Sequence, residues 1–321
     1  MSICVSQPDW PLDAGIPDLL ISRLSHLGLL AVTGEQGRSF IHGQVTTDIS
    51  SLTAEQWRWG AHCDPKGKML SSFRTFALGD ALILMMPRDT LAADLPQLKK
   101  YAVFSKAELV DVSDDYSLLG VAGAKAATWL AEQFPGFSPE QQVSAVDDGV
   151  VLQDGERFIL VLPKARAEAL CQQQSPVDAS AWQELEILAA YPNLPASHMG
   201  QFVPQMCNLQ AINGISFTKG CYMGQETVAR MKYRGGNKRA LYILKGKATV
   251  DVTPETTLEM ALDEGFRKGG SIIEAVQRNG ELLLTAVLAN DTEVGAKFRI
   301  ADDENSELTV LPLPYSLEEQ E

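Results

Sequence analysis

One order of secondary-structure signals occurs twice in the first 190 residues: strand, helix, hairpin, helix. The first set predicts strands at 27–32, 57–62, 69–78, 81–86 and 108–112, and helices at 35–45 and 90–102. The second predicts strands at 117–121, 150–153 and 158–162, and helices at 125–134, 164–172 and 179–190. This repetition indicates an α+β fold made of two ferredoxin-like split βαβ units that share a sheet.

The last third of the chain shows strand signals only, at 240–244, 271–278, 281–288 and 296–301. Asn279-Gly280 is the strongest hairpin signal in the chain. These signals predict a small barrel or sandwich, and of the two we expect a C-terminal β-barrel. The acidic, proline-containing stretch 302–321 is predicted to be a solvated terminus. The predicted domains are a first α+β unit at 1–115, a second at 116–238, and the barrel at 239–321.

Composition and charge exclude several classes of protein. The 321 residues are 45% hydrophobic, which is typical of a globular chain with a large core. The net charge of −14 should repel a phosphate backbone, so tight binding to nucleic acid is not expected. The most apolar run, 81–86, is far shorter than the roughly 20 residues that span a bilayer, and the acidic N-terminus does not resemble a signal peptide. We expect a cytoplasmic protein without a membrane partner.

The five cysteines, at 4, 63, 171, 207 and 221, form neither a disulfide framework nor a CxxC metal clasp. No metal site is predicted, and a reducing compartment fits this pattern. The GxSxG, HExxH, Walker and GxGxxG templates are absent, which excludes most hydrolases, kinases and dehydrogenases.

One basic segment stands out in this acidic chain. Between 219 and 239 there are six cations and one anion, which makes the segment a candidate anion site. Within it, Cys221 has small neighbours that leave its sulfur accessible, and nearby Lys219 would favour the thiolate. The alternative is a buried cysteine that acts as a small hydrophobe.

Other candidates each have a structural alternative. Gln225 and Glu226 could hydrogen-bond a polar heterocycle, or they could cap a helix at 227–231. Trp182 could stack on a pterin, although its place in an amphipathic helix favours the core. The 62–64 cluster (His-Cys-Asp) is interpreted as structural, because no further metal ligand has the required spacing.

Residues 219–226 (KGCYMGQE) match the KGCYxGQE signature of the YgfZ family. The match continues at 43–48 (GQVTTD), 62–69 (HCDPKGKM), 98–106 (LKKYAVFSK), 200–205 (GQFVPQ), 208–211 (NLQA), 234–240 (RGGNKRA) and 313–317 (LPYSL). The sequence thus resembles folate-binding proteins related to aminomethyltransferase and implicated in tRNA modification and iron-sulfur protein maintenance. The resemblance implies a tetrahydrofolate or related reduced folate as cofactor.

The resemblance also assigns roles to residues. The family's folate pocket is associated with two tryptophans: Trp182 matches the second, and Leu27 stands where the first is expected. The pteridine-binding carboxylate falls at Leu188, with Glu184 one turn earlier on the same helix face. A folate-binding role is also implied for Lys219, Tyr222, Gln225, Glu226 and Arg230.

Ser71 or Ser72 occupies the place of the aminomethyltransferase catalytic aspartate, so no glycine cleavage activity is expected. The first functional hypothesis is a folate-binding factor that supports assembly or repair of iron-sulfur enzymes and thereby tRNA modification, with Cys221 as the working thiol. Its partners would then be folate and iron-sulfur proteins. The alternatives are a folate-dependent one-carbon transferase of unknown substrate and a protein that binds tRNA directly.

Overall fold

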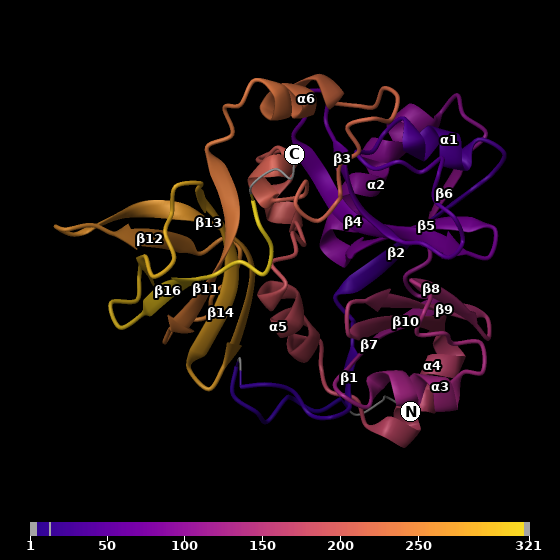
Figure 1. Cartoon of the computed structure of the whole chain (residues 1–321), viewed down its shortest axis with the longest axis horizontal. Helices are drawn as coiled ribbons and strands as arrows, with labels where there is room; N and C mark the ends of the chain where they lie inside the picture. Colours follow the sequence, from indigo (N-terminus) through magenta and orange to yellow (C-terminus); the bar gives the residue numbers. More distant parts are fainter. Residues whose placement is uncertain (1–4, 13, 318–321) are drawn as a thin grey trace.

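The computed structural model describes residues 5–12 and 14–317. It has two α+β units and a β-barrel, with helix α5 (Ser180–Leu188) between the barrel and the units (Figure 1). The α+β class and the C-terminal barrel are confirmed.

The first unit has a five-stranded antiparallel sheet with two helices. In spatial order its strands are β3 (Arg58–Cys63), β4 (Met69–Leu78), β5 (Ala81–Pro87), β2 (Leu27–Thr33) and β6 (Glu108–Asp111). The helices are α1 (Gly37–His42) and α2 (Arg88–Ala102). Apolar residues from both helices and from strands β2, β4 and β5 form one buried core. Gly79 and Asp80 form the turn that joins β4 to β5.

The second unit has its own antiparallel sheet. Its strands are β1 (Leu20–Arg23), β7 (Tyr116–Ala122), β10 (Arg157–Pro163), β9 (Gly149–Asp154) and β8 (Val143–Val146), and its helices are α3 (Ala126–Gln133) and α4 (Lys164–Gln174). The expectation of one shared sheet is therefore wrong. The two sheets instead share a hydrophobic core, because apolar residues of both face each other. Strand β1 lies in the predicted first domain but pairs with β7 of the second sheet.

The link between the second sheet and the barrel contains α5, two short 3-10 helices, η1 (Ala196–His198) and η2 (Pro204–Cys207), and α6 (Gln225–Tyr233). The closed barrel follows, with strands in the order β11 (Arg239–Lys247), β14 (Glu281–Ala289), β13 (Phe266–Arg278), β12 (Thr257–Ala261), β15 (Lys297–Ile300) and β16 (Glu307–Leu311). Asn279-Gly280 forms the β13–β14 turn, and both residues have positive φ, as a two-residue hairpin requires.

The expectation of a solvated terminus at 302–321 is wrong for its middle part. Strand β16 pairs with β11 and β15 and closes the barrel. Its alternating Leu308 and Val310 are buried in the barrel core. Tyr315 then donates a hydrogen bond from its hydroxyl to the carbonyl oxygen of Ala190 at 2.7 Å, which ties the end of the chain to the segment after α5.

Candidate functional site

The signature loop, residues 219–226, lies against two segments of the first unit. The Met223 N–H donates to the carbonyl oxygen of Gly43 at 3.1 Å, and just before the loop the Ser216 N–H donates to that of Thr46 at 2.8 Å. The Thr46 hydroxyl in turn donates to the carbonyl oxygen of Gly214 at 2.6 Å. The 43–48 motif is thus hydrogen-bonded to the signature loop and to the residues just before it, although these segments are far apart in the sequence.

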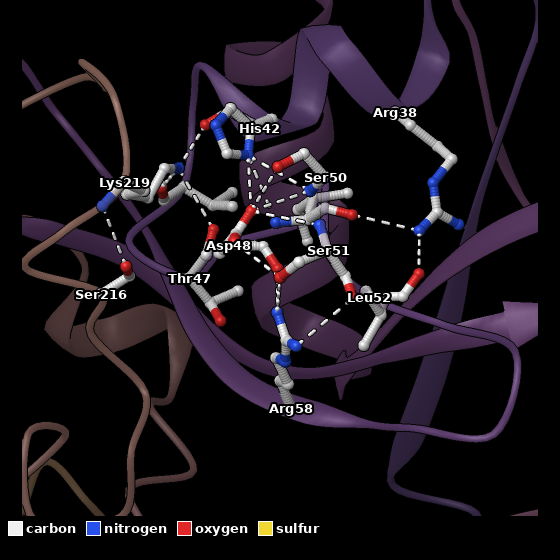
Figure 2. Close-up of polar contacts among 12 residues, drawn as sticks. Arg38, His42, Thr47, Asp48, Ser50, Ser51, Leu52, Arg58, Ser216 and Lys219 are labelled. Atoms are coloured by element: carbon white, nitrogen blue, oxygen red, sulfur yellow. Dashed lines mark hydrogen bonds and ion pairs between the residues drawn. The ribbon is translucent and has the colours of Figure 1, made fainter.

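Lys219 anchors this contact. Its Nζ donates to the carbonyl oxygens of His42, of Val45 at 2.7 Å and of Thr47 at 3.1 Å (Figure 2). Burial lowers the pKa of Lys219 to about 8, while nearby Asp48 acts in the opposite direction. The ammonium group also lies 4.8 Å from the centroid of the Tyr222 ring. These contacts assign Lys219 the role of fixing the loop on the 42–47 segment.

Two glycines hold the other end of the loop. Gly224 has φ +80°, and a Cβ there would lie 2.7 Å from the carbonyl oxygen of Asp64. Gly67 in the β3–β4 turn has φ +76°, and a Cβ there would lie 2.7 Å from the Cβ of Thr227. Only glycine fits both the conformation and the space at each position. The motifs at 62–69 and 219–226 are therefore in direct contact.

Cys221 is exposed, whereas the other described cysteines, Cys63, Cys171 and Cys207, are buried. Burial raises the pKa of each of these three thiols above the ordinary range. Cys4 lies outside the described residues. Among the described cysteines, Cys221 alone is open to a reagent or a partner.

The remaining signature residues are placed on or beside α6. Tyr222 is buried, and burial raises the pKa of its hydroxyl. Gln225 and Glu226 open α6, but the N-cap residue is Gly224 and no side chain caps the helix. Glu226 and Arg230 are exposed. The side chains of Gln225 and Glu226 are thus free of the capping role that the sequence left open.

A polar network extends from Lys219 through the 42–58 segment (Figure 2). The Asp48 carboxylate accepts hydrogen bonds from the Ser50 and Ser51 hydroxyls, each at 2.6 Å, and these bonds hold its pKa well below the usual range. Arg58 donates to the Asp48 carbonyl oxygen and, at 2.9 Å, to the Ser51 hydroxyl. The network connects the signature loop to Arg58, which lines a cavity.

That cavity has a volume of about 600 Å³ and lies where both α+β units meet the end of α5 and the C-terminal segment. It is lined by Gln56, Trp57, Arg58, Trp59, Gln142, Ala189, Tyr191, Ile212, Asn213, Pro314 and Tyr315. The buried Trp59 Nε1 has no hydrogen-bond partner among the described residues. Sequence reasoning missed this cavity, although the Trp57 and Trp59 pair on one strand face was a visible signal.

A buried charged cluster contacts the rings of Trp59 and Tyr191. The Arg74 guanidinium lies 4.4 Å from the Trp59 ring centroid and 5.1 Å from that of Tyr191. Its Nη2 contacts Glu186 at 2.8 Å and Asp154 at 3.2 Å. Burial lowers the pKa of Arg74, but these two carboxylates more than offset this, so the pKa is raised. Arg74 interrupts an apolar strand, which is the signal that could have identified the cluster.

The residues that the family resemblance assigned to folate lie elsewhere. Trp182 is fully buried, packs against Gly120 and lies under Arg157, whose guanidinium is 4.9 Å from its ring centroid. Leu27 is also buried. Glu184 is buried and contacts Arg278 at 3.0 Å. None of the three lines the 600 Å³ cavity, and the structure places Trp182 and the signature loop against different partners.

The residues of the 62–64 cluster have separate surroundings. The His62 Nδ1 lies 2.7 Å from the Asp94 carboxylate, which also accepts a 2.6 Å hydrogen bond from Ser71, and all three residues are buried. Asp64 instead accepts hydrogen bonds from two backbone N–H groups of its own turn. In the described part of the chain, no three His, Cys, Asp or Glu residues are grouped so as to hold a metal ion. Within the same residues, no helix is long and apolar enough to cross a membrane.

The fold belongs to a known class. The crystal structure of glycine cleavage system aminomethyltransferase T from Bartonella henselae superimposes with a TM-score of 0.66 at 18% identity, covering 92% of this chain and 86% of that one. The chain therefore has the aminomethyltransferase T fold.

Two further comparisons define the family. The family model described as "YgfZ, beta-barrel domain" matches residues 237–303. The tRNA-modifying protein YgfZ of Yersinia pestis (strain Pestoides F) is 43% identical over 315 residues, which cover 95% of each chain. The same protein of Yersinia pseudotuberculosis serotype O:1b (strain IP 31758) is equally similar over the same length. The chain belongs to the YgfZ family.

Proposed function

We propose that this protein binds a reduced folate and uses Cys221 to support the assembly or repair of iron-sulfur enzymes in the cytoplasm, including enzymes that modify tRNA. The observation that carries the proposal is the exposed Cys221 on a loop fixed at both ends, by Lys219 and by Gly224. A cysteine that reacts with a substrate or a partner needs an accessible thiol in a fixed position. A structural cysteine would instead be buried. The name of the Yersinia relatives supports the link to tRNA modification.

The 600 Å³ cavity fits a pterin-sized ligand. The aromatic rings of Trp57 and Tyr191 are suited to stacking, and the unpaired Trp59 Nε1 needs an acceptor. The amides of Gln56, Gln142 and Asn213 line the rim and supply further donors and acceptors. Tetrahydrofolate, when bound, supplies one-carbon chemistry. Roles for Trp182, Leu27 and Glu184 in binding remain predictions from the family resemblance.

The alternative of a one-carbon transferase has less support. Ser71 and Ser72 stand where the aminomethyltransferase aspartate is expected, and both hydroxyls are engaged. Ser71 donates to Asp94, and Ser72 donates to the carbonyl oxygen of Pro192. Neither group can act as a carboxylate, so we expect no aminomethyltransferase activity.

The test is complementation of a bacterial strain that lacks its own family member. We expect the wild-type protein to restore the activity of an iron-sulfur enzyme and the tRNA modification that this enzyme installs. Cys221→Ala should restore neither, although it should keep the wild-type melting temperature. Cys171→Ala is the matched control, because it removes a buried thiol from α4, and it should complement. Full complementation by Cys221→Ala would refute the thiol role.

A further inference from the structure

Another cavity, also of about 600 Å³, lies on the barrel and shares no lining residue with the one described above. Four cations line it: Lys238 and Arg239 at the start of β11, and Arg267 and Lys268 on β13. In the barrel, β14 separates these two strands. Neighbouring strands are about 5 Å apart, so the two pairs of cations come from strands roughly 10 Å apart.

In the part of the chain that the structure describes, none of the four cations forms an ion pair with a carboxylate. Other cations of the same barrel do so: Arg299 contacts Glu259 at 2.8 Å, and Lys297 contacts Glu307 at 2.9 Å. In a chain with a net charge of −14, four unpaired cations around one cavity create a local positive potential.

Two adjacent glycines, Gly269 and Gly270, form part of the cavity lining. The pairing of β12 with β13 passes from Leu258–Gly270 to Glu259–Lys268, so Gly269 is the extra residue of a β-bulge. A Cβ on Gly269 would lie 2.7 Å from the Met260 nitrogen, and one on Gly270 would lie 2.4 Å from a methyl carbon of Leu288. Both positions therefore require glycine, and only their backbone borders the cavity.

We propose that this cavity is a binding site for a small, flexible ligand with two or more anionic groups. Two sources share that chemistry: a chain of γ-linked glutamates and an oligophosphate chain. The separation of the two cation pairs favours a ligand with spaced charges over a single small anion. The volume of the cavity and the negative charge of the rest of the protein favour a small ligand over a long polyanion. The site does not depend on the proposed folate pocket.

Calorimetric titration of the full chain with inorganic triphosphate and, separately, with γ-linked triglutamate tests the proposal. We expect at least one probe to bind with an affinity that falls as salt rises. The double variant Arg267→Gln, Lys268→Gln should bind about tenfold more weakly, because two of the four cations that attract the anionic groups are lost. The probe that binds more tightly identifies the source.

The matched control is Lys99→Gln, Lys100→Gln, which removes two exposed cations from the end of α2. It should bind like the wild type. An equal loss in both double variants would show that only net charge matters and would overturn the site. No binding of either probe at millimolar concentration, or binding of an RNA oligonucleotide alone, would also overturn it.

Discussion

Gly224 and Gly67 approach each other so closely that neither can carry a side chain. A Cβ on Gly224 would lie 2.8 Å from the Cα of Gly67, and one on Gly67 would lie 3.0 Å from the carbonyl oxygen of Gly224. Both residues have positive φ. This contact sets the position of the signature loop on the β3–β4 turn, and with it the position of Cys221.

Gly224→Ala should therefore displace the loop. The added Cβ meets backbone atoms, and the left-handed conformation adds strain, so we expect a loss of about 2 kcal/mol or more in the free energy of unfolding. Urea denaturation measures this loss in the free energy of unfolding. Gly220→Ala is the control, because a Cβ there has no atom within 4 Å and its φ is not positive. Equal stability of the two variants would contradict the role of the glycine contact.

Glu274 should make stability depend on pH. It is buried between the barrel and α5, where Asn193 and Gln183 donate to it at 3.0 and 3.3 Å. Burial, with Glu186 nearby, raises its pKa from 4.5 to about 7. Because the folded pKa is raised, the folded state holds the proton more tightly. The protonated Glu274 therefore contributes to the free energy of unfolding. This contribution is complete below pH 4.5 and is lost as pH rises to about 7.

Glu274→Gln keeps the hydrogen-bonding shape but cannot ionise. Relative to the wild type, its free energy of unfolding should therefore increase between pH 5 and pH 8, by about 2 to 3 kcal/mol. Urea unfolding of both proteins at each pH measures this difference. A constant difference between Glu274→Gln and the wild type across this range would rule out the assignment.

Thiol accessibility gives a direct test of the exposed cysteine. In the native protein, a maleimide should label Cys221 rapidly, and Cys63, Cys171 and Cys207 should react only after denaturation. The reason is that burial blocks access and disfavours the reactive thiolate. Peptide mass spectrometry identifies the labelled residues. Native labelling of Cys63 or Cys207 at the rate of Cys221 would show that the core opens.

The elements that the sequence predicted well have strong local signals. The prediction of strand β4 at 69–78 is confirmed, because the Gly79-Asp80 turn marks its end. Strand β16 was missed although Leu308 and Val310 alternate correctly, because the acidic and proline residues around them suggested a solvated terminus. Periodicity identifies a buried face but not its partner. For that reason the division into two sheets could not be predicted from it.

The same limit applies to the site. Small residues around Cys221 indicated an accessible thiol, and the structure places it at the surface. The acceptors of Lys219 are carbonyl oxygens more than 170 residues away, and no local pattern indicates them. For Trp182, in contrast, the local pattern was sufficient. Its place in an amphipathic helix favoured the core, and the side chain is fully buried.

Nucleic acid should bind weakly at most. The net charge of −14 opposes a phosphate backbone, and counterion release requires several phosphate contacts at once. At physiological salt, we expect a gel shift to detect no submicromolar binding of unmodified tRNA. Under the proposed function, any effect on tRNA modification is then indirect, through an iron-sulfur enzyme. Submicromolar binding that Arg230→Ala or Lys232→Ala abolishes would show instead that the basic segment holds tRNA.

Folate binding should depend on the cavity between the units and on the basic segment in different ways. Tyr191→Ala removes a stacking surface worth about 1 kcal/mol or more, so affinity for tetrahydrofolate should fall at every salt concentration. Arg230→Ala and Lys232→Ala should weaken only the charged tail, so their effect should grow with the number of glutamates and shrink as salt rises. Calorimetry with mono- and triglutamyl tetrahydrofolate separates the two contributions.

Maleimide labelling of Cys221 should remain rapid in all three variants, because none of the three substitutions alters the contacts that fix the signature loop. Affinity that is unchanged in Tyr191→Ala and independent of salt in the wild type would place the folate elsewhere, and Trp182 with Leu27 would then be the next positions to test.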